Sequence, residues 1–416
     1  MNQIELLKEG VERKFGSPIK EVATLKILLR SIHKNADIEL SYNTLRRFFG
    51  FLTPTKPNIN TLNSLSQYLG FKNFYSFSNQ LHFPNWETWL YVLRLKQQDK
   101  ITKNAIRFIN AQLQNEYIAF YLIDLATHFF NQRNRIAFLM LFEAEIDKIT
   151  RSEQLRICVA LGIILRPLYQ KDKTFILSLI ESPQFRRIVV YNFVDYPSFN
   201  QGYMDLIERS ISLEQEEQYL LFLNVLSTYH SFLNGRPKAF LSLPKSYNLK
   251  NISPIVQGRY FANQLYSSAA DQQEEVFDQL LITCKNLNKC EFFFELIPTI
   301  LLLKRMDWIA IIFSKHYEEI FEINEFNRLT HLGIFQIAQA LLSIREGSFK
   351  NAKSELEKVN TYLAFDSYIE YITIFSFIAK YHLAEEKSVI KAQYIALSSK
   401  LGFKVFSLSL LEHYFD

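Results

Sequence analysis

A short polar segment near the N-terminus carries side chains that can read the edges of base pairs. Asn43, Arg46 and Arg47 follow Ser41 closely in the chain. Asparagine can pair bidentately with adenine, and arginine can pair in the same way with guanine. Arginine also neutralises phosphates, which positions a protein on a nucleic acid without reading its sequence. These residue types therefore predict a surface that contacts a nucleic acid.

The residues around this segment predict the helix that presents it. Leu45, Phe48 and Phe49 recur at the spacing of one helix face. Ser41 is a residue type that caps helix N-termini, and Gly50 is the type that ends them in left-handed geometry. The polar side chains must then lie on the outer side of a helix over residues 41–49.

A second helix is predicted beyond a polar loop that contains Pro54 and Pro57. Asn58 or Asn60 can cap this helix, and Gly70 ends it. Its inner face is expected to consist of Leu62, Leu65, Tyr68 and Leu69. With helices over residues 3–14, 21–35 and 73–81, the segment up to residue 83 has the composition of a small five-helix domain.

This order of residues resembles the helix-turn-helix of the lambda-repressor-like (XRE) family. The positions that follow the family pattern are Ser41, Thr44, Leu45, Arg47, Pro57, Thr61, Leu62, Leu65, Leu69 and Gly70. The resemblance covers only about the first 80 residues. Tyr42 is bulkier than the small polar residue common in the family, and the link over residues 34–40 is longer than the usual tight turn.

The resemblance implies a recognition helix that enters the major groove by its N-terminal end. The residues expected to contact DNA are Ser41, Tyr42, Asn43, Thr44, Arg46, Arg47, Lys56 and Asn58. Among them, Asn43 and Arg46 are expected to read bases, and Tyr42 to touch a thymine methyl or a sugar. Arg47, Lys56 and Asn58 are expected to face phosphates, with Thr55 as a weaker candidate.

Length, composition and charge divide the chain into two parts. A chain of 416 residues is too long for one typical core, and only 11 glycines and 11 prolines favour an all-α fold. Residues 1–83 hold 11 basic and 6 acidic side chains, whereas the rest holds 36 of each. Pro84 marks the expected boundary. We therefore predict a basic helix-turn-helix domain over residues 1–83 and a neutral domain over residues 84–416.

The larger part shows helical periodicity throughout, which favours a stacked array of helical hairpins. Ala340, Gly347 and Ala352 resemble tetratricopeptide-repeat (TPR) spacing, so this part is predicted to be a TPR-like α-solenoid. One helix is expected over residues 291–303, and an irregular segment over 185–203. The concave side is expected to present tyrosines and polar groups to a peptide or protein.

The motifs of common enzyme classes are missing from the sequence. It contains neither glycine-rich phosphate-binding motif, no G-x-S-x-G and no H-E-x-x-H. The eight histidines are scattered, and Cys284 and Cys290 lack further ligands in the sequence. We expect no enzyme activity, cofactor or metal. Three cysteines and the lack of a signal peptide or long apolar run predict a cytoplasmic protein without a membrane span.

Two hypotheses from different classes follow. The first is a transcriptional regulator whose head binds double-stranded DNA and whose body forms a homodimer, senses a peptide or protein, or does both. The second is a protein–protein interaction scaffold whose helix-turn-helix head is structural and does not bind DNA. The outer face of Tyr42, Asn43, Arg46 and Arg47 discriminates between them, because only the first requires that face to be open and positive.

Overall fold

The computed structural model describes residues 3–35, 38, 40–53, 57–80, 86–113, 115, 117–236, 252–321, 328–360 and 366–416. All regular secondary structure in these ranges is helical, which confirms the all-α prediction. The chain forms two compact units, Met1–Arg94 and Leu95–Asp416. The boundary predicted at residues 83 and 84 lies outside the described residues.

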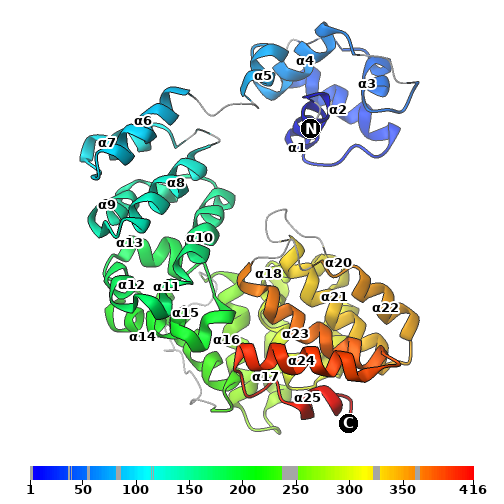
Figure 1. Cartoon of the computed structure of the whole chain (residues 1–416). Helices are drawn as coiled ribbons and strands as arrows, with labels where there is room; N and C mark the ends of the chain where they lie inside the picture. The colour runs from blue at the N-terminus through cyan, green and yellow to red at the C-terminus, as the bar shows by residue number, and fades with distance from the viewer. Residues whose placement is uncertain are drawn as a thin grey trace. The chain divides into compact units, whose positions relative to one another are not determined.

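In the described residues of the first unit there are five short helices and the start of a sixth (Figure 1). They are α1 (Gln3–Phe15), α2 (Val22–Asn35), α3 (Tyr42–Phe48), α4 (Ile59–Leu69), α5 (Phe74–Gln80) and α6 (Trp86–Gln97). Apolar side chains at helical spacing on α1 to α4 form one core, with Leu7, Leu25, Leu45 and Leu65 fully buried. Val22 is 38% exposed, because it begins the first turn of α2.

Capping residues set the ends of α3 and α4. Ser41 is the N-cap of α3, and Gly50 follows the helix in left-handed geometry, with φ +82°. Asn58, rather than Asn60, caps α4, and Gly70 ends it with φ +101°. Both glycines lie where a left-handed residue lets the chain leave the helix without a side-chain clash.

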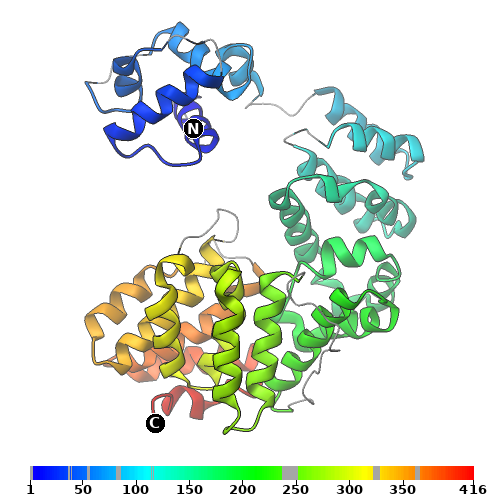
Figure 2. The same cartoon turned by 180° about the vertical axis from the view of Figure 1, so that it is seen from behind.

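The second unit is a succession of helices, most of which pack on their neighbours in the chain (Figures 1 and 2). Its first part contains α7 (Lys103–Ala111), α8 (Ile118–Asn131), α9 (Arg135–Met140), α10 (Arg151–Leu165), α11 (Leu168–Lys171), α12 (Lys173–Leu179), α13 (Pro183–Phe185), α14 (Met204–Leu213) and α15 (Glu217–Leu233). Its second part contains α16 (Pro254–Ser267), α17 (Gln273–Thr283), α18 (Lys289–Phe294), α19 (Ile297–Leu302), α20 (Met306–Phe321), α21 (Arg328–Arg345), α22 (Phe349–Glu357), α23 (Asp366–Leu383), α24 (Lys387–Leu401) and α25 (Leu408–Glu412).

The hairpin of α21 and α22 contains the residues that suggested a repeat. Ala340 and Ala352 are fully buried, and the two helices pack closely. Gly347 turns the chain between them with φ +75°, and Ser348 N–H donates to the Ser343 carbonyl at 2.8 Å. Small residues at these positions let the two backbones approach.

The helix predicted over residues 291–303 is broken. α18 ends at Phe294, and α19 carries Pro298 in its first turn. A proline ring in a continuous helix would clash with the carbonyl four residues earlier, which is that of Phe294. The break is therefore a consequence of Pro298, and it places Glu295 at the end of α18.

The segment predicted to be irregular contains two π-helical turns, η3 (Arg186–Val190) and η5 (Phe199–Tyr203), and the short 3₁₀ turn η4 (Tyr196–Ser198). Gly202 has φ +117°, and a Cβ added there would lie 2.8 Å from Tyr169 Cβ. The segment therefore packs closely on α11, and any residue larger than glycine would clash at position 202.

None of the helices in the described ranges has the length and apolar character that crossing a bilayer requires.

Candidate nucleic-acid interface

α3 lies on α2 and exposes the opposite side. Leu45 and Phe48 are buried in the core of the first unit, as the helical spacing predicts, and Phe49 packs against that core. Asn43 and Arg47 are exposed on the other side of the helix, and Arg46 is half-buried. The outer side of α3 is therefore polar and basic.

Ser41 and Thr44 serve the helix itself. The Ser41 hydroxyl accepts a hydrogen bond from the Thr44 backbone N–H at 3.1 Å. The two side-chain hydroxyls also lie 2.8 Å apart in hydrogen-bond contact. This pair fixes the first turn of α3 and so fixes the direction in which Asn43 projects.

Tyr42 is anchored to α2 and sits between two cations. Its hydroxyl donates to the Val22 carbonyl at 3.1 Å. The Lys26 ammonium and the Arg46 guanidinium lie 5.9 Å and 5.8 Å from the centre of its ring, respectively. Cations at this distance are attracted to an aromatic ring. The Tyr42 ring therefore attracts one cation from α2 and one from α3 to the same part of the surface.

Four basic side chains lie on or beside this face. Within the described residues, no ion pair is formed by Lys26, Arg30, Arg46 or Arg47. The Arg46 Nε is buried and has no hydrogen-bond partner among those residues. A guanidinium N–H can only donate, so this buried Nε is a donor without an acceptor among the described residues.

Asn58 does not join this group. Asn58 uses its side-chain oxygen to cap α4, accepting from the Thr61 backbone N–H and hydroxyl, each at 2.8 Å. Lys56 and Thr55 lie outside the described residues. The structure thus brings together the residues from Ser41 to Arg47, and it assigns Asn58 a local role at a helix end.

The second unit contains a buried polar network that sequence reasoning missed. Arg259 Nη2 donates to Glu295 Oε1 at 2.7 Å, and both side chains are almost completely buried. Tyr196 and Tyr368 donate to the same carboxylate at 2.8 Å and 2.6 Å. Tyr371 stacks on the Tyr196 ring, with centroids 4.1 Å apart. These groups come from four separate parts of the chain, so no local sequence pattern predicts that they meet.

The network changes the interpretation of the tyrosines in the second unit. The tyrosines buried in or beside it are Tyr196, Tyr203, Tyr229, Tyr266, Tyr368 and Tyr371. Because their rings are in the core, they cannot present themselves to a peptide on a concave surface. The expectation of a tyrosine-lined groove is therefore wrong for these residues.

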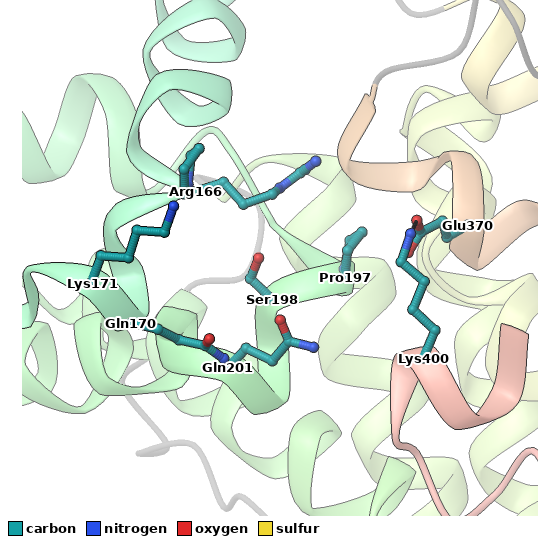
Figure 3. Close-up of a pocket in the computed structure, with 9 residues that line it drawn as sticks. Arg166, Gln170, Lys171, Pro197, Ser198, Gln201, Glu370 and Lys400 are labelled. Atoms are coloured by element: carbon teal, nitrogen blue, oxygen red, sulfur yellow. Dashed lines mark hydrogen bonds and ion pairs between the residues drawn. The ribbon is translucent and has the colours of Figure 1, made fainter.

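A cavity of about 280 Å³ opens beside the irregular segment (Figure 3). Arg166, at the end of α10, donates to both oxygens of the buried Asp195 at 2.9 Å and 2.6 Å. Its guanidinium also contacts Asp366 at the start of α23. Lys171, Gln170 and Gln201 line one side of the cavity, and Glu370 and Lys400 line the other. No sequence motif links these positions, which lie up to 234 residues apart.

The cysteines are structural thiols. Cys158, Cys284 and Cys290 are all buried. Burial raises the pKa of Cys158 and Cys290 to about 12 and also raises that of Cys284. The Cys284 Sγ lies 3.9 Å from His316 Nε2, and His316 Nδ1 lies 2.7 Å from a Glu319 oxygen. The thiol nevertheless stays protonated at neutral pH, which does not suit a nucleophile.

Comparisons of the chain with protein-family models, with curated proteins and with solved structures found no match.

Proposed function

We propose that the protein is a transcriptional regulator whose first unit binds double-stranded DNA through a helix-turn-helix formed by α2 and α3. In this proposal α3 is the recognition helix, as in the lambda-repressor-like proteins that the sequence resembles. The observation that carries it is the outer side of α3. Asn43, Arg46 and Arg47 project from a helix held on α2, and among the described residues neither arginine forms an ion pair.

The three side chains have different tasks in the proposed complex. Asn43 is exposed in the first turn of α3 and reads adenine. Arg46 lies against Tyr42 with its Nε unpaired and reads guanine. Arg47 is exposed and binds phosphate, and Lys26 on α2 adds a phosphate contact beside Tyr42. Tyr42 positions the two cations and need not touch DNA through its hydroxyl, which is bonded to Val22.

The second unit supplies the partner and the regulation. A single small head has too little surface for tight binding, so two heads on two half-sites are required. We propose that the helices of the second unit form a TPR-like array that joins two copies of the chain and senses a peptide. The hairpin of α21 and α22, with its buried alanines, supports the repeat assignment.

The test is DNA binding by fluorescence anisotropy at several salt concentrations, with the full chain and single variants. Arg47→Ala should weaken binding to all sequences and reduce the slope of log affinity against log salt by about one. Arg46→Ala should relax preference at one base pair, by about 1–3 kcal/mol. Arg13→Ala removes an equal charge from the exposed side of α1 and should bind as the wild type does.

The scaffold hypothesis makes the opposite prediction. If the wild-type chain binds no DNA at low salt, or if Arg46→Ala and Arg47→Ala both bind as Arg13→Ala does, the first unit is a structural domain. The protein is then an interaction scaffold, and the basic side of α3 is a solvated surface.

A further inference from the structure

The cavity beside the irregular segment contains none of the side chains used in the proposed DNA contact (Figure 3). α11 and η5 supply one side of it, and α23 and α24 supply the other. Two prolines, Pro167 and Pro197, add apolar surface to a lining that is otherwise polar. The volume of about 280 Å³ lies near the lower limit of about 300 Å³ for ligand pockets. The cavity can therefore hold only a small molecule.

The charges of the lining favour a ligand with a single negative charge. Lys171 is exposed, and among the described residues its ammonium forms no ion pair. The other two cations of the lining, Arg166 and Lys400, are each paired with carboxylates. Their charges are therefore balanced within the protein, and Lys171 is the group at which a carboxylate of the ligand gains an ion pair.

The rest of the lining favours hydroxyl groups. Gln170 and Gln201 are exposed, and each carboxamide can both donate and accept a hydrogen bond. The Lys400 ammonium keeps N–H donors beyond the one that it gives to Glu370. A hydroxyl group also donates and accepts, so it can pair with either end of a carboxamide and with the ammonium.

We propose that this cavity binds a small hydroxylated carboxylate, that is, a sugar acid of about six carbon atoms. Its carboxylate pairs with Lys171, and its hydroxyl groups form hydrogen bonds with Gln170, Gln201 and the Lys400 ammonium. Its carbon atoms lie against the two prolines. The ligand thereby connects α11 and η5 with α24. The inference goes beyond the proposed function, because it requires neither DNA nor a peptide.

Titration calorimetry of the full chain without DNA tests the proposal with three probes of equal chain length. Gluconate carries the carboxylate and the hydroxyl groups, sorbitol lacks the carboxylate, and hexanoate lacks the hydroxyl groups. Gluconate should bind with a dissociation constant of about 1 mM or tighter. Sorbitol and hexanoate should each bind about tenfold more weakly or not at all, because each loses one set of hydrogen bonds.

Variants assign the two sets of contacts. Lys171→Gln should bind gluconate no better than sorbitol. Lys171→Arg should keep most of the preference for gluconate, which separates loss of charge from loss of fold. Gln201→Met should reduce the preference for gluconate over hexanoate by about threefold or more, because one hydrogen-bonding group is lost. Lys353→Gln, which changes an exposed lysine on α22, is the matched control and should leave all three affinities unchanged.

The proposal is overturned if gluconate does not bind, or if sorbitol or hexanoate binds as tightly as gluconate. It is also overturned if Lys171→Gln retains the wild-type preference for gluconate over sorbitol. Sulfate that binds as tightly as gluconate would mean that Lys171 attracts any anion, and this result would overturn the proposal as well.

Discussion

The buried ion pair of Arg259 and Glu295 allows us to predict how strongly one substitution destabilises the second unit. The Glu295 carboxylate accepts hydrogen bonds from Arg259, Tyr196 and Tyr368, and it is 4% exposed. Glu295→Gln keeps the shape of the side chain but removes its charge. Arg259, which is 7% exposed, then carries a buried charge without a counter-ion. Breaking a buried pair in this way costs about 3–5 kcal/mol of unfolding free energy.

Urea denaturation followed by circular dichroism at neutral pH measures the loss. Glu295→Gln should lower the free energy of unfolding of the second unit by that amount. A second substitution, Arg259→Met in the Glu295→Gln background, removes the uncompensated charge and should restore most of the loss. Glu145→Gln breaks the exposed pair with Lys148 and should leave the free energy of unfolding unchanged within error.

The reasoning is refuted if Glu295→Gln loses less than about 1 kcal/mol, which is near the range of surface substitutions. It is equally refuted if the double variant is much less stable than Glu295→Gln, because the charge on Arg259 would then not be the cause.

Three further predictions concern stability. Leu45→Ala should destabilise the first unit by about 2–5 kcal/mol in urea denaturation, because Leu45 is fully buried. A loss below about 0.5 kcal/mol would mean that Leu45 does not face the core. Gly258→Ala should cost about 1–3 kcal/mol or more, because its Cβ would lie 2.1 Å from the Phe292 carbonyl oxygen; an unchanged melting temperature would contradict the close packing of α16 on α18. Burial raises the pKa of Glu295, but Arg259 and the two tyrosine hydroxyls outweigh it, so that the pKa lies below 4.5. The stability from this group should be fully present above about pH 4.5 and lost as the pH falls through the lower folded-state pKa. Thermal melts from about pH 7 to about pH 3 should show this acid loss in the wild type and a smaller one in Glu295→Gln.

Local patterns predicted the elements that local chemistry determines. Ser41 and Gly50 mark the ends of α3 because caps depend on neighbouring residues alone. The burial of Leu45 and Leu65 followed from helical spacing. Short elements such as α13 and α25 went unpredicted, because a few residues cannot show a period. The break before α19 could have been predicted from Pro298, whose ring excludes a continuous helix.

Long-range contacts explain what sequence reasoning could not reach. Arg259, Glu295 and Tyr368 meet only because separate helices pack together, and each alone resembles an ordinary polar residue. The same holds for Lys171 and Glu370, which lie 199 residues apart across the cavity. In the candidate interface, the link from Tyr42 to Val22 was also invisible, because it depends on how α3 lies on α2.

Selection of duplexes from a random-sequence DNA pool by the full chain tests the central claim most directly. If α3 reads DNA, successive rounds should enrich a motif with two-fold related half-sites about 10 base pairs, or a multiple of that spacing, apart. The same selection with Arg46→Ala should lose preference at one base pair of each half-site and keep the rest. A wild-type chain that enriches no motif, or a motif that Arg46→Ala enriches without change, would contradict the account.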